Sequence, residues 1–235
     1  MRIHGFQKMT MLDYPGKVAC TVFTGGCNLR CPFCHNALLV TGLADCPPCD
    51  EEEIFAYLGK RRGILDGVCL TGGEPLMNPD VAELLARIRE LGYAVKVDTN
   101  GCYPDRLRAI VEAGLVDYVA MDVKNRPEKY AATVGIPGFD TAAVEESVAF
   151  LKEGKVDCEF RTTVVAELHT AEDIAAIAQW IAGAPRYFLQ CFKPSERMIA
   201  GDALHAPDPD VLLKMKKMAE VCVPTEVRGT ELTAD

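Results

Sequence analysis

The chain has 235 residues, of which 49% are hydrophobic and 25% charged. This length argues for one domain over residues 1–235, with enough apolar side chains for a sizeable core. Its net charge of −9 disfavours broad nonspecific binding to nucleic acid. No apolar run approaches the roughly 18 residues that span a membrane. Neither nucleic acid nor a membrane is therefore expected as a partner.

The 11 cysteines are the unusual feature of the composition. A chain of this length needs no disulfides for stability, their number is odd, and the first residues contain no apolar signal segment. These features predict a cytoplasmic protein whose cysteines are reduced. They would then serve as metal ligands, reactive thiols or small core residues.

Short β-branched runs alternate with amphipathic stretches along the whole chain. The predicted strands are residues 17–24, 67–71, 94–98, 116–121, 157–165 and 186–192. Helices are predicted over residues 50–61, with Asp50 as N-cap, and over 80–91, ending at Gly92. Further helices are expected to begin near residues 104, 140, 170 and 207–209.

Strict alternation of strands and helices predicts an α/β fold with a parallel sheet and right-handed crossovers. The sheet is either open and doubly wound or a curved partial barrel. In both architectures ligands bind at the C-terminal ends of the strands, so the residues after each strand are the candidates for function.

The first predicted strand runs into a loop, residues 25–36, with the pattern Cys-x3-Cys-x2-Cys. Its cysteines are Cys27, Cys31 and Cys34. One helix face would also align them, but Pro32 and the preceding glycines argue against a helix. The metal interpretations are a closed four-ligand site completed by Cys46 or Cys49, holding zinc or a cluster, and an iron–sulfur cube held by three thiolates with one open iron.

The second predicted strand ends in Gly72-Gly73-Glu74-Pro75. This is either an ordinary glycine turn or a place where the backbone approaches a ligand closely. Asp98 and Asp122 stand at the ends of the next two predicted strands. Their carboxylates are interpreted as an acid–base pair, as a cation site or as solvated strand ends. Arg161 lies inside a strand, where it either faces a ligand or lies on the outer face with its head in water.

The cysteine motif, with Phe33 between its last two cysteines and Gly72-Gly73-Glu74 after the second strand, resembles the radical S-adenosylmethionine (SAM) superfamily. The resemblance implies a partial (β/α)6 TIM-type barrel and a [4Fe-4S] cluster on Cys27, Cys31 and Cys34. It also implies that SAM binds the open iron and that one electron cleaves it to methionine and a 5′-deoxyadenosyl radical. The resemblance further implies a set of SAM-binding residues: Phe33, Gly72, Gly73, Glu74, Asp98, Arg161 and Gln190.

Asp98-Thr99-Asn100-Gly101 and Met121-Asp122-Val123-Lys124 resemble glycyl-radical-enzyme activating proteins. In that branch the equivalents of Asp98, Thr99 and Asp122 surround a monovalent cation. Further segments across the chain look most like anaerobic ribonucleoside-triphosphate reductase activating proteins. The implied partners are a glycyl-radical enzyme and an electron donor of the flavodoxin or ferredoxin type. The alternatives are a radical SAM enzyme acting on a small molecule or peptide, and a non-catalytic zinc or iron–sulfur module.

Cys46 and Cys49 depart from the family pattern and are a candidate second metal site or redox pair. The cysteines inside strands, Cys20, Cys69 and Cys158, are expected in the core. Cys102 and Cys191, at strand ends, are not expected to be catalytic. The histidines outside the motif are expected to be surface or capping residues: His4, His169 and His205.

Overall fold

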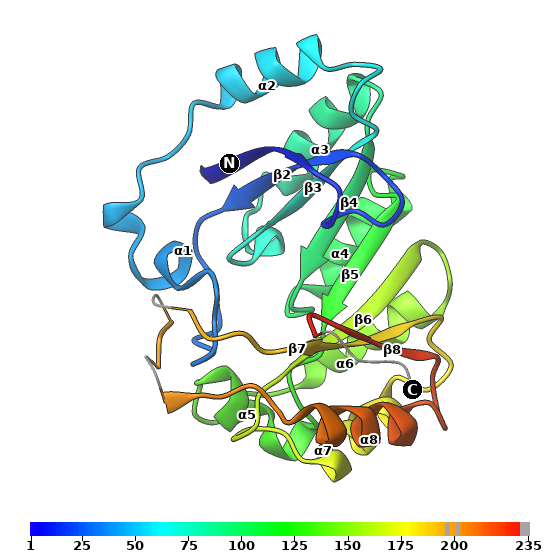
Figure 1. The fold of residues 1–235 in the computed structure, drawn as a ribbon. Helices are drawn as coiled ribbons and strands as arrows, with labels where there is room; N and C mark the ends of the chain where they lie inside the picture. Colours follow the sequence, from blue (N-terminus) through cyan, green and yellow to red (C-terminus); the bar gives the residue numbers. More distant parts are fainter. Residues whose placement is uncertain (196–197, 201–202, 231–235) are drawn as a thin grey trace. The chain divides into compact units, whose positions relative to one another are not determined.

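The computed structural model describes residues 1–195, 198–200 and 203–230 (Figure 1). The chain forms two compact units, each assembled from separate segments. Unit 1 comprises Met1–Asn28, Asn36–Ala120 and Lys155–Asp157, and unit 2 comprises Leu29–His35, Met121–Gly154 and Cys158–Asp235. The single domain over residues 1–235 stays a prediction.

Unit 1 is built around four complete strands and the first residues of a fifth. They are β1 Ile3–Thr10, β2 Ala19–Thr24, β3 Gly67–Gly72, β4 Ala94–Thr99 and the start of β5 Tyr118–Asp122. β1 pairs antiparallel with β2, whereas β2 with β3 and β3 with β4 are parallel. In this register Thr24 lies beside Gly72, so the loops that follow β2 and β3 leave from the same edge.

The helices of unit 1 begin and end where the local sequence dictates. They are α1 Ala37–Thr41, η1 Leu43–Asp45, α2 Glu51–Lys60, η2 Pro75–Met77, α3 Val81–Glu90 and α4 Pro104–Glu112. Asp50 caps α2, because its side chain accepts a hydrogen bond from the Glu52 amide. The strand side chains of Val68, Leu70 and Val95 are fully buried and form part of the core.

In its described residues, unit 2 contains the end of β5 and three further strands, the first of which begins with Asp157 of unit 1. Its elements are α5 Pro127–Val134, α6 Ala142–Lys152, β6 Asp157–Val164, α7 Ala171–Trp180, β7 Tyr187–Cys191, α8 Pro209–Ala219 and β8 Thr225–Arg228. β6 with β7 and β7 with β8 are parallel. Hydrogen-bonded strand order follows chain order, β1 to β8.

The six predicted strands correspond to β2–β7, and the predicted α/β class with parallel strands is confirmed. Four elements were not predicted from the sequence: β1, β8, α1 and α5. Within the described residues, no helix has the length and apolar character needed to cross a membrane.

Candidate active site

The glycine turn after β3 touches the start of the cysteine loop backbone to backbone. The Gly73 amide donates to Thr24 O (2.9 Å) and the Glu74 amide to Gly26 O (2.8 Å). A Cβ on Gly73 would lie 1.9 Å from Gly26 O, so only glycine fits. The close backbone approach expected of this turn therefore exists, and its observed partner is the loop that carries Cys27.

The side chain of Glu74 faces the protein interior and is 1% exposed. Its carboxylate accepts hydrogen bonds from the Leu76 amide (3.0 Å), the Thr99 hydroxyl (2.8 Å) and the Asn100 amide (2.7 Å). These contacts tie η2 to the end of β4. The carboxylate of Glu74 therefore has a structural role, and its contact with a cofactor stays a prediction.

Asn100 joins this network to the first motif cysteine, although it was not among the predicted site residues. Its Nδ2 lies 3.7 Å from Cys27 Sγ and 2.9 Å from Asn28 Oδ1. Its Oδ1 accepts from the Cys102 amide (3.0 Å). The one sequence signal was its place directly after Asp98-Thr99 at a strand end.

Asp98 and Thr99 both have protein partners in unit 1. Asp98 forms an ion pair with the buried Lys96, and the Thr99 hydroxyl donates to Glu74. A cation at Asp98 would have to share this carboxylate with an ammonium group. The monovalent cation site stays a prediction.

In unit 2, Asp122 lies between two cationic side chains. Arg161 Nε donates to Asp122 Oδ1 (2.9 Å) and Lys124 Nζ to Oδ2 (3.0 Å). Burial acts to raise the pKa of Asp122, but the Arg161 guanidinium and the Lys124 ammonium outweigh it and lower this pKa to about 2. Arg161 is 12% exposed, so its placement on the outer face with its head in water is wrong.

The remainder of the cysteine loop is anchored within unit 2. The Arg30 amide donates to Val134 O (2.9 Å), and the His35 Nε2 lies 2.8 Å from Lys193 O. The His35 ring also stacks on Phe192 with centroids 5.7 Å apart. Phe33 and Cys31 are buried, and Gln190 is half-buried at the end of β7; their roles toward SAM or the cluster stay predictions.

The surroundings of the motif cysteines fit an iron–sulfur cluster. Cluster thiolates carry negative charge and need hydrogen-bond donors or cations beside them. Cys27 has the amide of Asn100 beside it. Burial acts to lower the pKa of the Lys124 ammonium, but Asp122 and, after it, Cys31 outweigh burial and raise this pKa, so a cation faces Cys31 as well. Among the described residues, no three His, Cys, Asp or Glu side chains form a ready-made single-ion site. The ligand assignment therefore rests on the motif.

The acceptor pattern of the glycine turn fits a ligand amino group. Gly72 O accepts from Asn36 Nδ2 (2.7 Å) and Glu74 O from the Met77 amide (3.1 Å). In the part of the chain that the structure describes, Gly73 O has no such donor, and Gly73 as a residue is half-buried. This carbonyl is available to an ammonium group such as that of SAM.

Cys46 and Cys49 are half-buried in unit 1. The Cys46 thiol donates to His4 O (3.3 Å). Burial, together with the neighbouring Cys46, raises the pKa of the Cys49 thiol. A second metal site or redox pair here stays a prediction. Burial likewise raises the pKa of Cys191, which lowers its reactivity at neutral pH.

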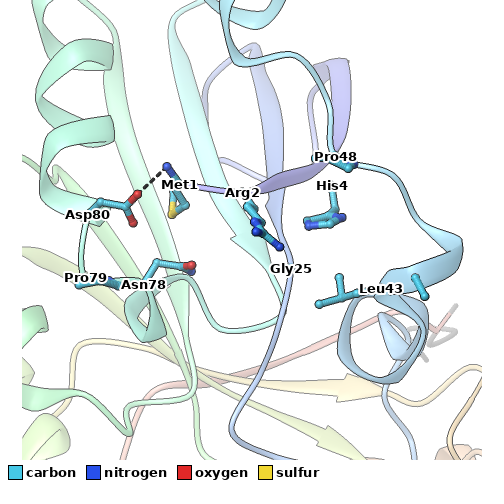
Figure 2. A pocket seen from close by; sticks show the side chains of 10 residues that line it. Met1, Arg2, His4, Gly25, Leu43, Pro48, Asn78, Pro79 and Asp80 are labelled. Carbon is cyan, nitrogen blue, oxygen red and sulfur yellow. Dashed lines mark ion pairs between the residues drawn. The ribbon is translucent and has the colours of Figure 1, made fainter.

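A cavity of about 750 Å³ in unit 1 borders the start of the cysteine loop at Gly25 (Figure 2). Its walls also include Arg2, His4 and Asp80. None of the predicted cluster or cofactor residues lines it. It is therefore distinct from the predicted site, although His4 and Leu43 pack directly against Gly25.

Similarity to known proteins covers most of the chain. A protein of Methanocaldococcus jannaschii described as a "putative glycyl-radical enzyme activating enzyme" is 33% identical over 199 residues, 83% of this chain and 81% of that protein. The 7-carboxy-7-deazaguanine synthase of Methanopyrus kandleri is 36% identical over 130 residues, 47% of this chain and 51% of the enzyme. The pyruvate formate-lyase-activating enzyme of Clostridium pasteurianum is 31% identical over 147 residues, 59% of this chain and 60% of the enzyme. The chain thus spans four fifths of the first relative and between half and three fifths of the other two.

The fold is also found in a solved structure. The crystal structure of Streptococcus suis SuiB matches 90% of this chain and 49% of SuiB with a TM-score of 0.70 at 12% identity. The family model that describes the Radical SAM superfamily matches residues 21–181. Members of this family use a [4Fe-4S] cluster and SAM, and the match begins in β2 and continues through α7. The chain belongs to the Radical SAM superfamily.

Proposed function

We propose that this radical SAM enzyme generates a glycyl radical on a partner enzyme. The observation that carries the proposal is the 33% identity, over four fifths of both chains, to the protein described as a glycyl-radical enzyme activating enzyme. The similarity to a pyruvate formate-lyase-activating enzyme supports the same class of reaction. Anaerobic ribonucleoside-triphosphate reductase as the partner is the narrower proposal and rests on the sequence resemblance.

Cys27, Cys31 and Cys34 would hold the cluster, which when bound supplies the electron that cleaves SAM to methionine and a 5′-deoxyadenosyl radical. The Gly73 carbonyl would accept from the amino group of SAM, since the neighbouring carbonyls are engaged. The other SAM-binding residues in the proposal are Phe33, Gly72, Glu74, Asp98, Arg161 and Gln190. Asp98, Thr99 and Asp122 would take the monovalent cation.

The test is activation of the anaerobic ribonucleotide reductase from the same cell by the anaerobically reconstituted, reduced enzyme and SAM. A glycyl radical signal by electron paramagnetic resonance is expected, and it should be absent with Cys31→Ala. SAM cleavage without any glycyl radical would refute the choice of this reductase. A parallel assay with pyruvate formate-lyase separates a wrong partner from a wrong class of reaction.

A second candidate is a radical SAM enzyme acting on a small molecule. It is favoured by the 36% identity over 130 residues to a 7-carboxy-7-deazaguanine synthase. That match covers half of each chain, against four fifths for the activating-enzyme relative, so we place it second. Substrate-dependent formation of 5′-deoxyadenosine with a precursor of the deazaguanine type, and none with a glycyl-radical enzyme, would reverse this order.

The non-catalytic binding module is tested by metal content. Four irons per chain that persist in the Cys46→Ser/Cys49→Ser double variant, together with reductive cleavage of SAM, would eliminate it. Zinc that is lost in this variant would favour the module. The cytoplasmic location and the flavodoxin- or ferredoxin-type donor are part of the proposal and follow from the class of reaction.

A further inference from the structure

We infer that Asn100 is a positioning residue that hydrogen-bonds the first cluster cysteine and thereby raises the reduction potential of the cluster. The inference rests on the proposed role of Cys27 as a cluster ligand. Asn100 is 6% exposed, and its Nδ2 lies 3.7 Å from Cys27 Sγ, a normal distance for an amide donor and a sulfur acceptor. Nothing in the sequence motif for the cluster requires an amide here.

The orientation of the Asn100 side chain is fixed by its neighbours. Oδ1 accepts from the Cys102 amide (3.0 Å), and Nδ2 donates to Asn28 Oδ1 (2.9 Å). A flipped amide would set two oxygens against each other at Asn28 and two donors against each other at Cys102. The remaining N–H of Nδ2 is therefore the group that faces the sulfur.

The backbone of Asn100 is held as firmly as its side chain. Its amide donates to the buried carboxylate of Glu74 (2.7 Å), which also accepts from the Thr99 hydroxyl and the Leu76 amide. The Gly101 amide in turn donates to the Thr99 hydroxyl (3.1 Å). The donor at Cys27 is thus preorganised and needs no rearrangement when the cluster gains charge.

A preorganised donor favours the more negative form of its acceptor. Reduction adds one electron to the cluster and increases the negative charge on its ligand sulfurs, so an N–H···S hydrogen bond is stronger in the reduced state. Burial strengthens this difference, because little water competes at Asn100. Removing the donor should therefore make the cluster harder to reduce.

The experiment compares three variants of the reconstituted holoenzyme by potentiometric titration followed by electron paramagnetic resonance. Asn100→Asp keeps an oxygen for the Cys102 amide but has no N–H for Cys27. Asn100→Ser is neutral and too short to replace the amide. Asn78→Asp adds the same charge elsewhere in unit 1, where the native Nδ2 donates to Pro75 O.

At the midpoint potential of the wild type, we expect the ratio of reduced to oxidised cluster to be about tenfold lower in Asn100→Asp. For a one-electron reduction this corresponds to a midpoint potential that is lower by about 59 mV. A fall of several fold is expected in the neutral Asn100→Ser, and less than twofold in Asn78→Asp. Unchanged ratios in both Asn100 variants at full iron content would overturn the inference. Loss of the cluster from both Asn100 variants would also overturn the inference, because Asn100 would then be needed for cluster binding. An equal change of the ratio in Asn78→Asp would overturn it as well, because the effect would then come from the added charge alone.

This titration needs no partner enzyme, so its result is independent of the glycyl radical assay. A wild-type protein that binds four irons but activates no glycyl-radical enzyme would refute the proposed function and leave the inference on Asn100 standing. A wild-type protein that takes up no cluster would refute the cluster assignment of Cys27, and with it both proposals.

Discussion

Replacing Glu74 by alanine is expected to destabilise the chain even without cluster or SAM. The sequence motif assigns Glu74 to the cofactor, but its carboxylate is 1% exposed and accepts three hydrogen bonds from protein groups. Glu74→Ala would leave the Leu76 and Asn100 amides without this acceptor. The perturbation therefore separates a structural role from a role in SAM binding alone.

The magnitude follows from the two backbone donors. A buried donor that loses its partner costs about 1–3 kcal/mol, so the two donors left by Glu74→Ala should lower the free energy of unfolding by about 2–6 kcal/mol. The Thr99 hydroxyl adds less, because it can rotate toward another acceptor. For a chain of this size, at about 2–4 °C per kcal/mol, the midpoint temperature of unfolding should fall by about 4–24 °C.

The assay is urea unfolding of the cluster-free, reduced chain followed by circular dichroism. Glu90→Ala, which removes an exposed carboxylate at the end of α3, is the control and should stay within about 0.5 kcal/mol of the wild type. Thr99→Val should cost about 1 kcal/mol. A Glu74→Ala variant within 1 kcal/mol of the wild type would refute the reasoning, because the three hydrogen bonds would then contribute nothing to the fold.

Three further predictions concern pH and packing. The pKa of Asp122 is lowered to about 2 in the folded state, so the ionised carboxylate should contribute about 2 kcal/mol to the free energy of unfolding above pH 4. This contribution should be lost as the pH falls towards 2. The free energy of unfolding of Asp122→Asn, measured with urea, should therefore vary less with pH than that of the wild type. Burial lowers the pKa of His169, so the unfolded chain binds the proton more readily and the free energy of unfolding should fall as the pH drops below about 6.5. His169→Gln should remove this part of the pH dependence. A pH profile of stability that is the same in the variant and the wild type would contradict the prediction. Gly73→Ala should cost about 1–3 kcal/mol and reduce iron uptake, because the new Cβ overlaps Gly26 O. Gly59→Ala, at an exposed position of α2 with free space for a Cβ, should instead stabilise the chain by up to about 1 kcal/mol. Equal iron uptake by both glycine variants would argue against this packing.

Local patterns predicted the elements whose signals are local. The β-branched runs located β2–β7, and Asp50 marked the start of α2 because its capping hydrogen bond spans only two residues. α5 was missed although Pro127 stands in its first turn and Gly135 follows its end with φ +68°. That proline–glycine arrangement is a helix signal that the sequence contained.

Other features depend on partners far apart in the chain. β1 shows no regular alternation of buried and exposed residues and gains its register from pairing with β2. His169 was expected at the surface or as a capping residue, and the surface alternative was wrong, because His169 is 3% exposed. Its side chain instead bonds two backbone groups: Nδ1 accepts from the Val165 amide (3.1 Å) and Nε2 lies 2.8 Å from Lys124 O. The ion pair of Arg161 with Asp122 joins residues that the sequence could only treat separately.

The edge of β1 has a consequence for the behaviour of the protein at high concentration. Among the residues that the structure describes, β1 has a strand neighbour on one side only. An uncovered edge strand can pair with another chain and lead to ordered aggregation. Here the Cys49 amide donates to Ile3 O (2.7 Å) and the Tyr57 hydroxyl to Lys8 O (2.9 Å). The loop that carries Cys46 and Cys49, together with α2, therefore covers this edge. Independently of any role of the two thiols, these contacts leave fewer backbone groups of β1 open to pairing with another chain, so the segment should disfavour self-association through β1.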